Sequence, residues 1–279
     1  GAWNSGDKMW YYRIGECMQA HGVVCVVLNY TLFPAGLLDD MLQDIHHALC
    51  WVGRHAHEYG GDAARVTLVG HSAGAHLACL YALRRSARAW VCDCCGSEPP
   101  SARAFIGLAG VYNLARHYVF ESHRGVHRLS ALHRVVGGQP FRAHSPSWLV
   151  RLLAHHRAPA VKRAPGAHSP TNSTDAQGED TCGGTDSFRE STTPGAPLPA
   201  LHLYHGHVDT TVPFSSSAEF AAEAAPAAAP ARVRLVGLDF ADHTALLWAL
   251  MDADSYWGAL LVRDVVRIAR GAGAEDVAG

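Results

Sequence analysis

One turn constrains the fold of this chain more than any other feature. The turn, Gly70-His71-Ser72-Ala73-Gly74, joins an apolar run at 65–69 to a run at 75–85. The first run is rich in β-branched residues and predicts a buried strand. The second favours helix and ends in two arginines, which stabilise a helix C-terminus. A strand, a sharp turn and a helix in this order are typical of α/β proteins.

The same alternation recurs along the chain. Residues 23–30 form a continuous apolar run that predicts a strand, and apolar residues recur at helical spacing between 41 and 52. Further strands are expected with helices between them, at 104–109, 200–204 and 232–238. We therefore predict a single domain over residues 1–279, with a mostly parallel sheet covered by helices on both faces.

The turn at 70–74 is also suited to hold a nucleophile. A serine in a strained turn between strand and helix presents its hydroxyl, and flanking glycines avoid Cβ clashes. The backbone N–H of Ala73, at the helix N-terminus, faces the place where a tetrahedral oxyanion would form. Ser72 is therefore the candidate nucleophile. The alternative is a glycine-rich turn with an incidental serine, because such a pattern arises by chance in roughly one chain in ten of this length.

A serine nucleophile needs a base and an orienting acid, which follow it as acid and then base in one common chain order. Asp209 follows the strand predicted at 200–204, and His243 lies in the loop after the strand predicted at 232–238. All three residues thus follow the carboxyl ends of strands, which meet at one edge of a parallel sheet. The sequence predicts Ser72, His243 and Asp209 as nucleophile, base and acid.

The chain has 19 histidines, so the candidate base must be chosen by its position along the chain relative to the predicted strands. His202, His205 and His207 precede the last strand, so we expect His205 to pack against the turn and the others to be strand or loop residues. Asp239 and Asp242 share the loop of the candidate base, where a carboxylate reaches Nδ1 less readily. Asp242 is expected to cap the following helix.

Composition and charge exclude several classes of function. The 23 basic and 25 acidic side chains give a formal net charge of −2, so no broad field recruits nucleic acid or an anionic membrane surface. No apolar stretch approaches the about 20 residues of a membrane span, and the first residues lack a signal pattern. We expect neither a nucleic-acid partner nor a membrane span in this chain.

Neither the cysteines nor the histidines predict a metal site. Four of the eight cysteines lie in apolar patterns, where a free thiol behaves as a small hydrophobe: Cys17, Cys25, Cys50 and Cys79. The cluster Cys92-Asp93-Cys94-Cys95 lacks the second pair that a structural zinc site needs. Three pairs of histidines lack the spacing of zinc hydrolases and are expected at the surface: His46 with His47, His55 with His57, and His155 with His156. We expect no metal and no cofactor.

Other segments are expected to carry less chemistry. Residues 86–103 read as a surface insertion, and residues 114–154 as short helices that form a lid over the site. Residues 158–197 are rich in Pro, Gly, Ser and Thr and predict a disordered insertion. An alanine-rich helix at 221–231 is expected to be interrupted or ended by Pro226. Tyr112 and Asn113 leave a strand end, so they either contact substrate or only form a turn.

Specific stretches resemble a known family. Residues 60–66, leading into the serine turn, resemble the hormone-sensitive-lipase-like branch of the α/β-hydrolases, most closely the plant isoprenylcysteine α-carbonyl methylesterases. The likeness covers most of 1–154 and 198–250, and the stretches around Tyr112-Asn113 and Arg124-Gly125 narrow it to this branch. The resemblance implies a serine esterase for prenylcysteine methyl esters, at an endoplasmic reticulum or Golgi membrane through an N-terminal anchor. The residues themselves leave the location unknown.

The first residues resemble the end of the family's His-Gly-Gly-Ala-Trp oxyanion loop, because Gly1-Ala2-Trp3 is followed by Gly6-Asp7-Lys8. By this resemblance, the backbone amides of Gly1 and Ala2 would join that of Ala73 as oxyanion donors. The resemblance also implies that N-terminal strands are missing, including one between 23–30 and 66–70. We therefore expect an N-terminally truncated sequence with poor solubility or weak activity.

Three functions fit these residues. The first is a serine carboxylesterase for a small-molecule ester, prenylated by the resemblance. The second is an arylformamidase or general carboxylesterase of the same branch, with the same three residues and a different pocket. The third is a non-catalytic protein that keeps the hydrolase fold to bind a ligand, which the presence of His243 disfavours.

Overall fold

Four parallel strands form the centre of the structure, a computed structural model that describes residues 1–87, 98–157, 196–228 and 232–271. They follow one another across the sheet in chain order: β1 (Val66–His71), β2 (Ala102–Leu108), β3 (Ala200–Gly206) and β4 (Val233–Leu238). The predicted α/β fold with a parallel sheet is confirmed. Its four described strands agree with the expected ones to within two residues at each end.

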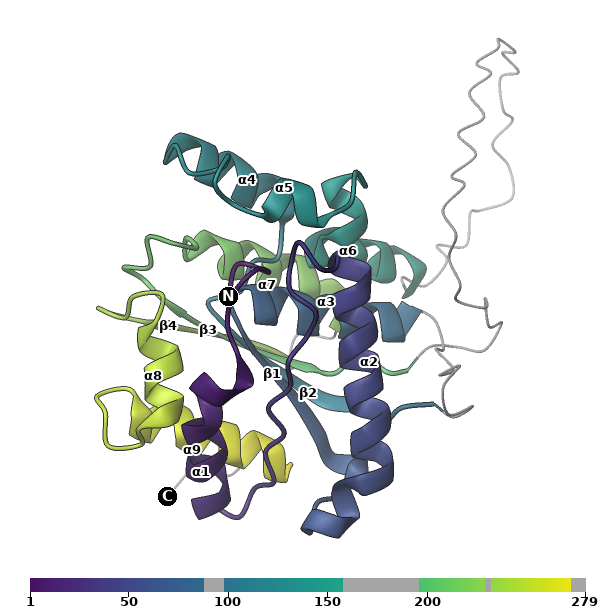
Figure 1. Ribbon diagram of the computed structural model, residues 1–279, viewed down its shortest axis with the longest axis vertical. Coiled ribbons are helices and arrows are strands. Elements are labelled where there is room, and N and C mark those ends of the chain that lie inside the picture. The colour runs from purple at the N-terminus through teal and green to yellow at the C-terminus, as the bar shows by residue number, and fades with distance from the viewer. Residues whose placement is uncertain (88–97, 158–195, 229–231, 272–279) are drawn as a thin grey trace, which may run out of the picture.

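Helices cover both faces of this sheet (Figure 1). One face carries α2 (Leu38–His55), α3 (Ala73–Ala87), α6 (Pro146–Arg157) and α7 (Ser215–Ala228). The other carries α1 (Tyr12–Ala20), α8 (Ala245–Met251) and α9 (Gly258–Arg270). Two further helices, α4 (Leu114–His123) and α5 (Leu132–Val135), lie together at one end of the molecule, above α6 and α7 in Figure 1. Short 3-10 turns complete the order: η1 (Lys8–Tyr11), η2 (Ala56–Tyr59), η3 (Ala63–Arg65) and η4 (Phe141–His144).

Burial on both faces explains why the inner strands are apolar along their whole length. On β2, Phe105 packs into the core beneath α3, α6 and α7, whereas its neighbour Ile106 packs into the core beneath α8 and α9. Leu203 and Tyr204 divide in the same way on β3. Because successive side chains of a strand point to opposite faces, both must be apolar when both faces are covered.

The strand expected at 23–30 is wrong, because these residues pair with no described strand. Between residues 23–28 and the free edge of β1 runs a groove of about 580 Å³. A strand needs a neighbouring backbone about 5 Å away to complete its hydrogen bonds, and this groove keeps β1 out of reach. The apolar run of 23–30 correctly indicated contact with the core, since Leu28 and Tyr30 pack against it.

Several smaller expectations can also be compared with the structure. Pro226 does not end α7, which continues to Ala228, and so the expected interruption is wrong. His46 was expected at the surface, yet it is 4% exposed and its Nδ1 is 3.0 Å from the hydroxyl of Tyr81.

The expected insertion at 158–197 and the cluster at 92–95 fall almost entirely outside the described residues. Among the helices that are described, none is both long and apolar enough to cross a membrane.

Candidate active site

Ser72 lies between the end of β1 and the start of α3 in a strained turn. Its φ of +54° is left-handed, and its N–H donates to the carbonyl of Leu108 over 2.9 Å. The preceding Gly70 allows the turn, because a Cβ there would stand 2.4 Å from the carbonyl oxygen of Gly74. The strand and helix thus approach so closely that only glycine fits, as the sequence pattern indicated. The turn leaves Ser72 9% exposed.

The structure brings Ser72, His243 and Asp209 into one hydrogen-bonded chain. His243 Nε2 is 2.9 Å from Ser72 Oγ, and His243 Nδ1 is 2.7 Å from Asp209 Oδ2. The second carboxylate oxygen of Asp209 accepts the backbone N–H groups of Thr211 and Val212, at 2.8 and 2.9 Å. Three loops, after β1, β3 and β4, therefore deliver these side chains to the same edge of the sheet.

The carboxyl group of Asp209 is buried, which by itself would raise its pKa. Hydrogen bonds from His205 and His243, and the backbone N–H of Val212, outweigh this burial and hold the pKa of Asp209 well below its usual range. A carboxylate that accepts several N–H groups is stabilised in its charged form. Asp209 can therefore stay ionised beside an imidazole that gains a proton.

His71 contacts the loop of His243, which the sequence did not reveal. Its Nε2–H donates to the carbonyl oxygen of His243 over 2.7 Å, and the two rings lie 4.7 Å apart. Burial, followed by the nearby His243, lowers the pKa of His71 to about 4, so His71 stays neutral and remains a donor at neutral pH. Its position inside the serine turn was the available signal, but its partner lies 172 residues away.

The rival residues are placed elsewhere. His207 pairs with Asp239 at 2.7 Å in an exposed position, and His202 lies on β3 with a pKa lowered to about 4, mainly by burial. Asp242 accepts the N–H groups of Thr244 and Ala245 at the start of α8, where we expected a cap. His205 differs from the other rivals because it contacts Asp209 itself, at 3.3 Å.

The three expected oxyanion donors differ in their surroundings. Ala73 begins α3 directly after Ser72. Gly1 lies in a tight turn, in which its carbonyl oxygen accepts the N–H groups of Asn4 and Ser5 at 3.2 and 3.1 Å. Ala2 has a left-handed φ of +50° in the same tight turn, which Trp3 anchors by donating its Nε1–H to His76 over 3.1 Å. His76 lies on α3, so the N-terminal turn packs against the helix that begins directly after the candidate nucleophile.

Tyr112 and Asn113 were expected to contact substrate or to form a turn. Tyr112 is completely buried and its ring stacks on Phe220 at 4.3 Å, so its position does not support a substrate contact. Asn113 is the N-cap of α4, and its side chain accepts the N–H of Arg116 over 3.1 Å. Its capping role explains the residue, and it also lines a pocket.

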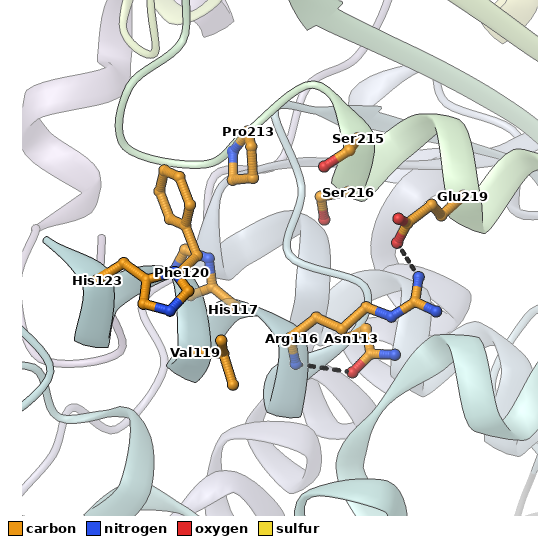
Figure 2. Close-up of a pocket in the computed structure, with 10 residues that line it drawn as sticks. All are labelled: Asn113, Arg116, His117, Val119, Phe120, His123, Pro213, Ser215, Ser216 and Glu219. Atoms are coloured by element: carbon orange, nitrogen blue, oxygen red, sulfur yellow. Dashed lines mark hydrogen bonds and ion pairs between the residues drawn. The ribbon is translucent and has the colours of Figure 1, made fainter.

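This pocket of about 250 Å³ lies between α4 and the start of α7 (Figure 2). Arg116 reaches across from α4 to form an ion pair with Glu219 of α7, and Phe120 points toward Pro213 on the opposite wall. Most of the ten lining residues are polar, and neither Ser72 nor His243 is among them. Within the described residues, no three His, Cys, Asp or Glu side chains gather as a metal site would require.

Comparison with known proteins gives a consistent family. A family model described as BD-FAE matches residues 1–145, just over half of the chain. A probable isoprenylcysteine alpha-carbonyl methylesterase of Arabidopsis thaliana is 32% identical over 152 residues, which make up 54% of this chain and 32% of that protein. A rice relative of the same description is 26% identical over 84% of this chain and 48% of its own length. The chain thus spans from 32% to 48% of the length of these curated relatives.

Bacterial proteins also match. A probable carboxylic ester hydrolase of Mycobacterium tuberculosis, LipM, is 32% identical over 53% of this chain and 34% of its own length. Among solved structures, a propionate-bound esterase of Thermogutta terrifontis has a TM-score of 0.61 at 23% identity, covering 98% of this chain and 82% of that one. Esterase B of Lactobacillus rhamnosis has a TM-score of 0.65 at 15% identity, covering 97% and 74%. At these identities, the structures show a shared fold.

Proposed function

Because this chain belongs to the BD-FAE family of α/β-hydrolase esterases, we propose that it is a serine carboxylesterase that hydrolyses a small-molecule carboxylic ester. The observation that carries the proposal is the continuous hydrogen-bonded chain from Ser72 through His243 to Asp209. A serine hydroxyl is a weak nucleophile by itself. Bonded to an imidazole that a carboxylate orients, it can lose its proton as it attacks.

In the proposed mechanism, Ser72 Oγ attacks the ester carbonyl while His243 Nε2 takes the hydroxyl proton. The tetrahedral intermediate then expels the alcohol, which receives that proton from His243. Water attacks the acyl enzyme by the same route and releases the acid. Asp209 keeps the proton of His243 on Nδ1, so that Nε2 has a free lone pair, and its charge stabilises the imidazolium.

The oxyanion of each intermediate needs hydrogen-bond donors. We propose the backbone N–H of Ala73 as one donor, supported by its place at the start of α3, where the helix dipole favours negative charge. The backbone of Ala2 is the proposed donor on the other side. The backbone N–H of Gly1, which precedes Ala2 in the same tight turn, is the third proposed donor.

A prenylcysteine methyl ester is the finer proposal for the substrate, supported by the names of the plant relatives. A prenyl tail would need a long apolar groove. The pocket between α4 and α7, of about 250 Å³, is mostly polar and is lined by neither Ser72 nor His243, so it does not supply that groove. We propose that residues 114–154, which include α4 and α5, form the lid that contributes to specificity.

The proposal is tested with purified protein and three substrates: p-nitrophenyl butyrate, farnesylcysteine methyl ester and N-formylkynurenine. We expect turnover of the first. Preference for the second would support the prenylcysteine proposal, and preference for the third an arylformamidase. A fluorophosphonate probe should label the wild type and fail to label Ser72→Ala.

Labelling that survives in Ser72→Ala would exclude Ser72 as the nucleophile. A folded wild type that neither turns over these substrates nor reacts with the probe would favour the third alternative, a hydrolase fold that only binds a ligand.

A further inference from the structure

His205 is a completely buried histidine that contacts the candidate acid. It lies near the end of β3, four residues before Asp209, and its Nε2 is 3.3 Å from Asp209 Oδ2 and 2.9 Å from the carbonyl oxygen of Val212. On the other side of the ring, Nδ1 is 2.7 Å from Ser217 Oγ in the first turn of α7. Ser217 is also completely buried.

The contacts of this ring determine where its protons lie. The carbonyl of Val212 and the carboxylate of Asp209 can only accept hydrogen bonds, so His205 Nε2 must carry a proton and donate. In the neutral imidazole, Nδ1 is then an acceptor, and the hydroxyl of Ser217 must be its donor. Ser217 thus selects the tautomer of His205 in the way that Asp209 selects the tautomer of His243.

Asp209 is therefore held by four N–H groups. Thr211 and Val212 bind Oδ1, whereas His205 and His243 share Oδ2. Without His205, the carbonyl of Val212 would lose its hydrogen-bond donor. Asp209 Oδ2 would then be bound only by His243, the side chain that Asp209 has to orient. Small errors in the orientation of a catalytic group are costly, because the reacting atoms must stay aligned.

Building on the proposed esterase function, we propose that His205, fixed by Ser217, is a positioning residue that orients Asp209 toward His243. The direction of the Asp209 pKa agrees with this role. Burial would raise the pKa, and the hydrogen bond from His205 is the largest of the influences that lower it.

The test compares four variants. His205→Leu removes both hydrogen bonds, His205→Gln keeps an N–H donor near the Nε2 position, and Ser217→Ala removes the group that selects the tautomer. His46→Leu is the matched control, because His46, on α2, is another buried histidine bonded to a hydroxyl, and its partner Tyr81 is not part of the hydrogen-bonded chain of Ser72.

We expect His205→Leu to lower kcat for p-nitrophenyl butyrate by about 10- to 100-fold with KM unchanged, as for other residues that orient a reacting group. His205→Gln should keep most of the wild-type kcat, and Ser217→Ala should lose about fivefold, the value of one ordinary hydrogen bond. His46→Leu should lose stability without losing kcat. An unchanged kcat in folded His205→Leu would overturn the proposal, and if that variant does not fold, an unchanged kcat in Ser217→Ala would do so.

A second measurement needs no turnover and separates this proposal from the proposed function. The proton on His243 Nδ1, bonded to Asp209, should give a far-downfield proton NMR signal. We expect it to shift upfield or vanish in Ser217→Ala and His205→Leu, and to persist in His46→Leu. If the signal keeps its position in the first two variants, His205 does not orient Asp209, whether or not the wild type hydrolyses esters.

Discussion

Ser72 combines backbone strain with support from its neighbours. A left-handed conformation costs a residue with a Cβ about 1–2 kcal/mol, and Ser72 has a φ of +54°. Its N–H donates to Leu108 and its carbonyl accepts the N–H of His76, so the turn is held at both ends. The strain therefore comes from the backbone conformation at residue 72 and not from the hydroxyl group of the side chain.

This strain predicts a difference between two inactive variants. Both Ser72→Ala and Ser72→Gly should lose esterase activity, because neither has a nucleophile. Ser72→Gly should exceed Ser72→Ala in free energy of unfolding by about 1 kcal/mol, since glycine adopts this φ without a Cβ clash. Urea denaturation measures the difference, and equal stabilities would show that the turn is unstrained.

Two aspartates near His243 offer a matched comparison. Asp209→Asn should lower kcat by about 10⁴-fold, because an amide can donate to Nδ1 and so leave the imidazole proton on Nε2, facing Ser72. Asp239→Asn should keep wild-type kcat, since Asp239 is exposed and bonds His207 instead. Steady-state kinetics on p-nitrophenyl butyrate checks both. A larger loss in Asp239→Asn would reverse the assignment of the acid.

At the scale of elements, the loop between β4 and α8 packs directly on the end of β3. A Cβ on Gly206 would stand 1.9 Å from the carbonyl oxygen of Ala241, two residues before His243. Gly206→Ala should therefore push this loop away and reduce both kcat and thermal stability, by more than 1 kcal/mol for the latter, as overpacking does. Gly15→Ala in α1, where a Cβ would meet nothing within 4 Å apart from the helix's own neighbouring backbone, should instead be neutral or stabilising. Circular dichroism melts and steady-state kinetics compare the two variants. Equal thermal stability and equal kcat in both would contradict this close packing at Gly206.

The elements also show which features of the sequence determine structure. Strands such as 200–204 could be predicted, because burial on both faces leaves a continuous apolar run. The strand at 23–30 could not be separated from an apolar coil, because the pattern reports contact with the core and not the presence of a pairing partner. The order of Ser72, Asp209 and His243 followed from the repeated strand, loop and helix. The sequence also placed His205 against its own turn, but it did not reveal the contact of His205 with Asp209 or the hydrogen bond from His71 to the carbonyl of His243, because such contacts leave no periodic signal.

Across the part of the molecule that the structure describes, burial keeps four histidines neutral, namely His71, His76, His144 and His202. Burial is the largest cause that lowers the pKa of each, to about 3 for His76 and to about 4 for His71, His144 and His202. His76 shows why the neutral form fits. Its Nδ1 accepts the Nε1–H of Trp3, and its Nε2–H donates to the carbonyl of His144. A proton added to Nδ1 would break the bond that anchors the N-terminal turn.

From the lowered pKa values of these histidines we predict that mild acid lowers the free energy of unfolding. Their pKa is 6.5 when unfolded and lower when folded, so between pH 6.5 and about 4 the unfolded chain binds more protons. The free energy of unfolding should therefore be fully present above pH 6.5 and fall with pH through this window, by about 2 kcal/mol at pH 5 for His76 alone. Asp209 acts outside the window, because a carboxylate with a lowered pKa loses its contribution only below its usual value of 3.8. Urea denaturation at pH 7, 6 and 5 measures the slope, which should be shallower in His76→Gln. A free energy that does not change over this range would mean that the four histidines titrate in the folded protein as they do in the unfolded chain.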